Sequence, residues 1–356
     1  MTPKLQKVLV RERRLRIAGV LLILICSLVV LLAVDNMLLS FVLAFVVNYL
    51  LTPIVDVLER RGVPRHASIL IPFLGTGLLL GFAIYAVVPL VSSQASTLAG
   101  QWPKYQADLT KLIVSTENDF KSYFRFYNAS FSGTVNDWIV DKTGELSSAL
   151  PSALSGSITV LALTPIFAYF MLQDGRVMSR KLLSLVPNNL FELALNLNHQ
   201  LNEQMGGFIR ARFLEAAIVG IVVWLGLQIS SFPYAMLMGV IAGVTNLIPY
   251  IGPIIGAVPA ILIALFSPDA LMNDSMSWTL VVVISVYFFA QLVDMLFIIP
   301  MVVARIVNLH PVTVIVVIIV GSQLMGVLGM VISIPVASAI KLIFHSFYEH
   351  LMDFRA

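Results

Sequence analysis

The protein has 356 residues, of which 59% are hydrophobic and only 12% are charged, with a formal net charge of +3. An ordinary soluble domain has about twice that charged fraction, so the composition excludes this class. Because a membrane-spanning helix needs about 20 apolar residues, and strand-length alternation of apolar and polar residues is missing, the sequence predicts an all-α polytopic membrane protein. Seven stretches lack Asp, Glu, Lys and Arg: 17–34, 36–55, 67–103, 146–173, 216–268, 275–293 and 306–340.

Basic residues indicate how the chain is oriented. They crowd the N-terminal segment 1–16 and the turn 60–65 after the second apolar run. By the positive-inside rule both segments face the cytoplasm, which predicts a multi-pass protein of the bacterial inner membrane with both termini cytoplasmic. A cleaved signal peptide is the alternative, but the first apolar run exceeds the usual signal length.

The first part of the chain is expected to hold three spans, in residues 17–91. The polar region 92–154 follows, balanced in charge and therefore placed outside the cytoplasm. Its apolar residues recur at helical spacing, which favours either an extracytoplasmic gate or a helical hairpin packed on the membrane domain. A fourth span over 155–172, a cytoplasmic amphipathic segment over 173–207 and a fifth span over 208–229 come next.

The second part, 208–345, is expected to form a transport unit. Its apolar stretches 234–266 and 311–341 are broken by Pro and Gly near 248–253 and by Gly near 321–326. Each arm is too short to cross the membrane, which predicts two re-entrant helical hairpins. With a sixth span over 278–300 and a cytoplasmic tail over 346–356, one span plus a hairpin occurs twice in opposite orientation. Such inverted repeats frame the substrate site of secondary transporters, so the two tips are expected to meet near the midplane.

Several motifs resemble those of the autoinducer-2 exporter family, in the same order over about 40–350. They are Phe45-x3-Tyr49-x3-Pro53, Gly62-Val63-Pro64-Arg65-x-Ala67, the run from Pro165 to Gly175, the run from Asn246 to Pro253, Gln291-x2-Asp294, Leu309-His310-Pro311 and Gly326-x2-Gly329-x4-Ile334-Pro335. The resemblance implies export of autoinducer-2, a small polar signal of quorum sensing, by a homo-oligomer that is pentameric where described. Some relatives are described as sodium/proton antiporters.

Enzymatic activity is not expected. The five histidines show no metal-ligand spacing, and neither a nucleophile elbow nor a phosphate-binding glycine loop is present. We expect no cofactor, no metal and no nucleic-acid partner. The expected partners are lipid, a small polar solute and Na⁺ or H⁺. An exporter is the leading function, a monovalent cation/proton antiporter is the alternative, and an oligomeric scaffold or channel is the third possibility.

Polar residues inside the apolar stretches are the candidates for ion coupling, since they are costly in lipid. Gln291 and Asp294 share one face of span six with Tyr287, and Glu215 opens span five. One reading makes Asp294 the ion-coupling group together with Gln291 and Glu215. The other reading pairs it structurally with an arginine, and Glu215 can pair with Arg212 at i+3. The candidate charge partners are Arg210 and Arg212.

Polar and helix-breaking residues at the hairpin tips are the candidates for solute binding. Their hydroxyl and amide groups suit a neutral, oxygen-rich solute, although they can instead satisfy the backbone freed at broken helix ends. The candidates are Thr245, Asn246, Pro249, Tyr250, Gly252 and Pro253 in the first hairpin, and Ser322 and Gln323 in the second. The glycine pairs 77/81, 239/243 and 252/256 are interpreted as close helix packing.

Overall fold

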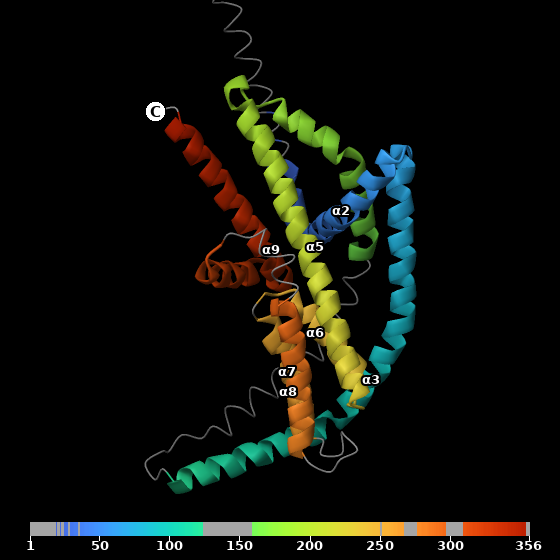
Figure 1. The fold of residues 1–356 in the computed structure, drawn as a ribbon, viewed down its shortest axis with the longest axis vertical. Helices are drawn as coiled ribbons and strands as arrows, with labels where there is room; N and C mark the ends of the chain where they lie inside the picture. The colour runs from blue at the N-terminus through green and yellow to red at the C-terminus, as the bar shows by residue number, and fades with distance from the viewer. Residues whose placement is uncertain are drawn as a thin grey trace, which may run out of the picture. The chain divides into compact units, whose positions relative to one another are not determined.

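A computed structural model describes residues 36–123, 159–249, 251–266, 276–296 and 309–353, with a discontinuous set between 19 and 34. Within these ranges the chain is helical and contains no strand, which confirms the all-α class. Figure 1 labels the helices α2 (Met37–Arg60), α3 (Arg65–Tyr123), α5 (Phe191–Ile229), α6 (Ala235–Asn246), α7 (Gly252–Phe266), α8 (Met276–Val293) and α9 (Pro311–Asp353). An unlabelled helix covers 159–183, and a 3-10 turn, η1, covers Asn188–Leu190.

Four helical stretches of the described chain are long and apolar enough to cross a membrane. They are Met37–Arg60, Arg65–Asp108, Trp278–Leu296 and Val312–Ser346. Residues 159–172 of the expected span over 155–172 lie within the longer helix 159–183, and the expected span over 208–229 lies within α5. The segments 1–16 and 124–158 and Tyr250 lie outside the described residues. Helix α3 also continues past the expected end of span three at 91, and the chain remains helical through Gly100 and Pro103.

The helices form two compact units. Unit 1 contains Met1–Leu78, Ser155–Arg210 and Ile306–Ala356, and unit 2 contains Leu79–Leu154 and Ala211–Arg305. Helices α3 and α5 therefore contribute to both units. The hairpin over 234–266 belongs to unit 2, and the hairpin over 311–341 belongs to unit 1.

The first hairpin of the sequence prediction corresponds to α6 and α7, which pack side by side in unit 2 (Figure 1). Their 12 and 15 residues reach only about 18 and 22 Å, less than the apolar thickness of a bilayer of about 30 Å. The link between them contains Pro249 and ends at Gly252. A Cβ at Gly252 would lie 2.0 Å from the carbonyl oxygen of Thr245, so only glycine allows this tight turn.

Helix α9 contains the second break. Met325 and Gly326 leave helical geometry, and Gly326 has a φ of 60°. The chain folds back there, because Gly321 and Gly329 lie backbone against backbone: a Cβ on Gly329 would stand 1.9 Å from the Gly321 carbonyl oxygen. The arm after the break runs to Asp353, beyond the expected end of the hairpin at 341. Helix-forming residues continue through this stretch, and no Gly or Pro follows Pro335 to stop it.

Small residues bring α5 and α6 together in the core of unit 2. A Cβ at Gly239 would stand 2.5 Å from the Cβ of Trp224, and one at Gly243 would stand 2.9 Å from the Ala216 carbonyl oxygen. The close-packing interpretation is therefore confirmed for Gly239 and Gly243. It is not met at Gly77 and Gly81, which face open space among the described residues. Leu227, Met238, Ile263 and Val283 fill the core around this contact.

Helix α3 holds the start of α6 through two glutamines. The N-cap of α6, Tyr234, has a φ of 61° and makes no capping hydrogen bond with its side chain. The backbone N–H of Leu237 instead donates to Gln94 Oε1 at 2.9 Å, and the Tyr234 hydroxyl donates to Gln101 Oε1 at 2.9 Å. A helix start leaves several N–H groups without an intrahelical partner, so Gln94 supplies the missing cap from another helix.

Candidate functional site

A buried ion pair lies on α5 in unit 2. The Arg212 Nη1 donates to both carboxylate oxygens of Glu215, at 2.6 and 2.7 Å. The two residues are three positions apart, which places them on neighbouring turns of one helix face. Glu215 is only 2% exposed and Arg212 is 9% exposed. Both charges are therefore almost completely removed from solvent. Breaking a buried ion pair is costly because it leaves an unpaired charge.

Asp294 is a second buried carboxyl beside this pair. It begins a π-helical turn over 294–296, directly after α8, and is 3% exposed. Glu215 lies within hydrogen-bonding reach of it, and Arg212 interacts with it electrostatically. Its Oδ1 is buried and accepts no hydrogen bond from the described residues. Two carboxyls thus share one guanidinium, a geometry that favours holding a proton or a cation between them.

Two amides complete this cluster. Asn246, at the last turn of α6 and 2% exposed, places its Nδ2 3.5 Å from Glu215 Oε1. Gln291, on α8, donates from Nε2 to Asp294 Oδ2 at 3.4 Å. We name the set Arg212, Glu215, Asn246, Gln291 and Asp294 the carboxyl cluster. The carboxyl cluster joins α5, α6 and α8. The two amides add no charge to it.

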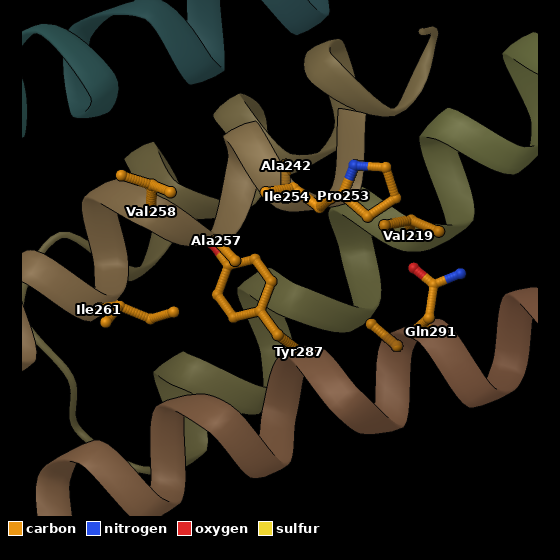
Figure 2. A pocket seen from close by; sticks show the side chains of 10 residues that line it. Val219, Ala242, Pro253, Ile254, Ala257, Val258, Ile261, Tyr287 and Gln291 are labelled. Carbon is orange, nitrogen blue, oxygen red and sulfur yellow. The ribbon is translucent and has the colours of Figure 1, made fainter. Parts of the chain in front are cut away.

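A pocket of about 310 Å³ opens next to the carboxyl cluster, within unit 2 (Figure 2). Gln291 belongs to both. The pocket walls are mainly apolar, and its polar groups are the Gln291 amide and the Tyr287 hydroxyl, which donates to the Gly256 carbonyl oxygen at 2.9 Å. Its lining residues are Val219, Ala242, Pro253, Ile254, Ala257, Val258, Ile261, Tyr287, Ala290 and Gln291.

The structure separates the expected solute-binding residues of the first hairpin. Pro253 lines the pocket, and Asn246 belongs to the carboxyl cluster. The Thr245 hydroxyl donates to the carbonyl oxygens of its own helix at Ile241 and Ala242. Pro249 is buried, Gly252 packs against the Thr245 backbone, and Tyr250 lies outside the described residues.

The other expected residues lie in unit 1. In the second hairpin the Ser322 hydroxyl donates to the Ile319 carbonyl oxygen, and Gln323 is exposed. Arg210 is the last residue of unit 1 along α5, and its Nη1 donates to the carbonyl oxygen of Tyr49 at 3.2 Å. Arg212, not Arg210, therefore accompanies Asp294. Among the described residues no group of three His, Cys, Asp or Glu side chains could hold a metal ion.

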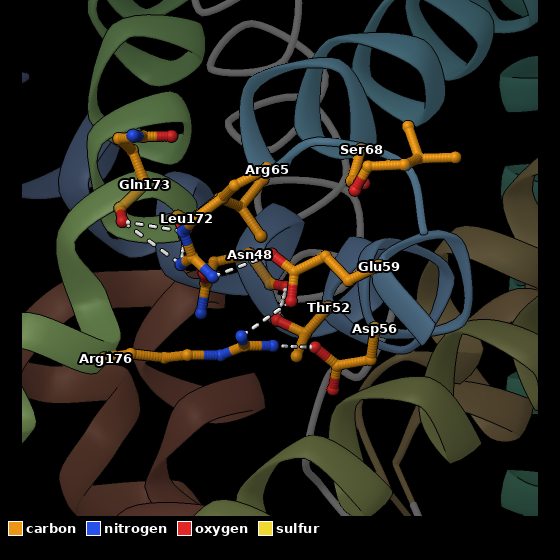
Figure 3. Close-up of polar contacts among 10 residues, drawn as sticks. Asn48, Thr52, Asp56, Glu59, Arg65, Ser68, Leu172, Gln173 and Arg176 are labelled. Carbon is orange, nitrogen blue, oxygen red and sulfur yellow. Dashed lines mark hydrogen bonds and ion pairs between the residues drawn. The ribbon is translucent and has the colours of Figure 1, made fainter. Parts of the chain in front are cut away.

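Unit 1 contains a polar network that the sequence pattern did not single out (Figure 3). Glu59 near the end of α2 accepts from Arg65 at 2.8 Å and from Arg176 at 2.6 Å. Arg176 also pairs with Asp56, and Arg65 donates to the carbonyl oxygen of Leu172 at 2.6 Å. Partial burial lowers the pKa of Arg176, but the hydrogen bonds and charges of Glu59 and Asp56 outweigh it and raise that pKa overall.

This network fixes the turn between α2 and α3 against the helix over 159–183. The turn contains Gly62, whose φ of 86° favours glycine. The spacing of Asp56 and Glu59 on one face of α2 was a signal in the sequence, but their partner Arg176 is more than a hundred residues away. Gln94 and Gln101, seven residues apart on an apolar helix, were a comparable signal for the contact with α6.

Apolar helices of spanning length, short paired helices and a buried charged cluster define a multi-pass α-helical membrane protein. The family profile described as "AI-2E family transporter" matches residues 21–349, and the chain belongs to this family. It is 27% identical over 316 residues to "Putative transport protein YrrI" of Bacillus subtilis, covering 87% of this chain and 86% of that protein. It is 28% identical over 346 residues to "Putative permease PerM" of Escherichia coli, covering 92% of each. The family resemblance expected from the motifs is confirmed, and the protein is a membrane transporter of this family.

Proposed function

We propose that this transporter is a secondary exporter of a small metabolite and that the carboxyl cluster binds its coupling ion. The observation that carries the proposal is the unmatched Oδ1 of Asp294 beside Glu215. Only Arg212 among the described neighbours is positively charged, so one negative charge is left over when both carboxyls are ionised. A buried uncompensated charge is costly, and a proton on either carboxyl removes the charge and supplies the absent hydrogen bond.

The proposal has a direct test in proteoliposomes. Export of a solute panel is measured with and without a pH gradient and with and without Na⁺, while a pH-sensitive dye follows proton movement. Asp294→Asn keeps the size of the side chain and removes its titratable charge. We expect this variant to assemble and to lose the ion dependence of transport.

The matched control is Asp108→Asn. Asp108 lies on α3 in unit 2 and pairs with Lys111 at 3.3 Å, with the lysine side chain 79% exposed. This variant should transport with the ion dependence of the wild type. An Asp294→Asn protein that assembles normally and keeps its ion dependence would refute the coupling role. If Asp294 is instead only a structural partner of Arg212, Asp294→Asn should destabilise the protein.

Autoinducer-2 is the first solute to test, because the family resemblance implies it. The same carboxyl cluster also supports the alternative of a monovalent cation/proton antiporter, in which Asp294 exchanges Na⁺ for H⁺. One assay distinguishes the two functions. Proton movement driven by Na⁺ in liposomes that contain no organic solute favours the antiporter, while solute-dependent proton movement favours the exporter.

The proposal includes a topology for the chain, with both termini and the turn 60–65 cytoplasmic. Cysteines placed at Thr2 and at Lys142 in a Cys26→Ala background should differ in labelling by an impermeant reagent in intact cells. Equal labelling would refute this orientation. We also propose that α6–α7 and the broken helix α9 are re-entrant hairpins and that the protein is a homo-oligomer, with a pentamer expected by light scattering of the purified protein.

A further inference from the structure

The pocket next to the carboxyl cluster differs in chemistry from the hairpin tips that the sequence pattern favoured. Eight of its ten lining residues are Val, Ala, Pro or Ile, contributed by α5, α6, α7 and α8. A volume of about 310 Å³ accommodates a small organic molecule, and apolar walls favour burial of an apolar body. The pocket does not offer the several polar groups that a solute with many hydroxyls needs.

The two polar groups of the pocket both present acceptor atoms. The Tyr287 proton is used in the bond to Gly256, which leaves the phenolic oxygen as an acceptor. The Gln291 Nε2 is directed to Asp294, and Figure 2 shows the amide oxygen on the side of the pocket. When Glu215 and Asp294 are both ionised, the one negative charge that Arg212 does not compensate adds negative potential. An occupant therefore needs a hydrogen-bond donor, which a hydroxyl or an amine supplies.

We infer that this pocket binds a small solute with an apolar body and a hydroxyl or amine donor at one end, and that Gln291 determines this specificity. Gln291 lines the pocket and also donates a hydrogen bond to Asp294 within the carboxyl cluster. A donor bound to its Oε1 holds the amide in place and polarises its N–H, which strengthens the hydrogen bond to Asp294 Oδ2. Gln291 is thereby a positioning residue for Asp294. The solute does not contact the Asp294 carboxyl but affects it through the hydrogen bond from Gln291.

This second role rests on the proposed coupling function, and it predicts a direction for pH dependence. A stronger hydrogen bond to Asp294 favours its ionised form, so solute binding releases a proton. Linkage is reciprocal, so the solute binds more tightly at alkaline than at acidic pH. The charged group that faces the pair is Arg212 on α5, and the titratable Tyr287 on α8 lines the pocket. Helices α6 and α7 contain no titratable residue in their described ranges.

The test uses the purified full-length protein in detergent and three probes with the same body: benzyl alcohol, benzylamine and toluene. Binding is measured from the concentration dependence of the thermal unfolding midpoint, at acidic and at alkaline pH. We expect a donor probe to bind the wild type more tightly than toluene and more tightly at alkaline pH. The alcohol and amine arms decide which donor the pocket prefers.

Substitutions locate the binding. Gln291→Leu should weaken the donor probes roughly 2- to 12-fold, the equivalent of one hydrogen bond, and leave toluene unchanged. Ala257→Phe fills the pocket and should abolish binding of all three probes, with Ala257→Leu as the milder variant if the first does not fold. Gln228→Leu is the matched control: Gln228 is exposed near the end of α5 and does not line the pocket.

Two outcomes would overturn the inference. Equal effects of the probes on wild type and both Ala257 variants would show that they bind elsewhere, and an unchanged donor preference in Gln291→Leu would remove Gln291 from specificity. The two proposals can fail separately. A donor preference that depends on Gln291 supports the pocket even if transport shows no ion dependence, whereas loss of ion dependence in Asp294→Asn supports the coupling site whatever the probes do.

Discussion

Arg212 donates from one nitrogen to both oxygens of Glu215 across a single turn of α5, with both side chains buried. This contact keeps one negative charge of the carboxyl cluster compensated and leaves Asp294 as the second. Removing the cation of this pair should therefore lower the stability of the protein more than removing its anion. Removal of Arg212 leaves two carboxyls together, whereas removal of Glu215 leaves Arg212 beside Asp294.

We therefore expect Arg212→Gln to lower the free energy of unfolding by about 3–5 kcal/mol, the cost of an unpaired buried charge. Glu215→Gln should cost less, because Asp294 remains to compensate the guanidinium. Thermal unfolding of the purified variants in detergent measures both. Arg210→Gln is the control: Arg210 is exposed and bonds only a backbone carbonyl among the contacts described, so a loss as large as that of Arg212→Gln would contradict the assignment.

The contact between α3 and α6 predicts a second effect. Gln94→Ala removes the group that accepts from the Leu237 N–H, which costs about 0.5–2 kcal/mol, as loss of a helix N-cap does. Hydrogen exchange should rise first in the opening turn of α6. Ser93→Ala is the neighbouring control, since the Ser93 hydroxyl bonds its own helix. An unchanged exchange rate at α6 in Gln94→Ala would contradict the proposed cap.

The fold of α9 predicts that glycine is required where its arms cross. Gly329→Ala forces a Cβ against the Gly321 backbone, and we expect a loss of about 1–3 kcal/mol or more, as in other overpacked sites. Gly77→Ala is the matched substitution in a helix with open space around it. It should stabilise α3 by up to about 1 kcal/mol, because alanine has the higher helix propensity. Similar effects of the two substitutions on the unfolding midpoint would contradict the close crossing.

The network at the α2–α3 turn predicts a dependence on salt. Glu59→Gln weakens contacts to both Arg65 and Arg176. It should lower the free energy of unfolding by roughly 1–2 kcal/mol, a value kept small because Arg176 is half exposed and solvent weakens its ion pair. Asp56→Asn removes one exposed contact and should cost about 0.2–1 kcal/mol. The difference between Glu59→Gln and the wild type should shrink as NaCl is raised, because salt screens exposed charges. A difference independent of salt would mean that Glu59 acts through packing instead.

The sequence determined what depends on neighbours along the chain. Hydropathy predicted a multi-pass helical protein, and Pro249, Gly252 and Gly326 marked the two places where helices break, because loss of an amide donor or a positive φ is a local property. The i+3 spacing of Arg212 and Glu215 likewise allowed their contact to be predicted from α5 alone.

The tertiary structure decided which of these residues meet. Arg210 and Arg212 are equivalent candidates in the sequence, but Arg212 belongs to the same unit as Asp294, about eighty residues further on, and interacts with it. Thr245 and Asn246 are adjacent, yet the Thr245 hydroxyl donates to its own helix, whereas the Asn246 amide contacts Glu215. The apolar pocket has no signature in the sequence, because four helices form it, and periodicity gives the face of each helix without its partner.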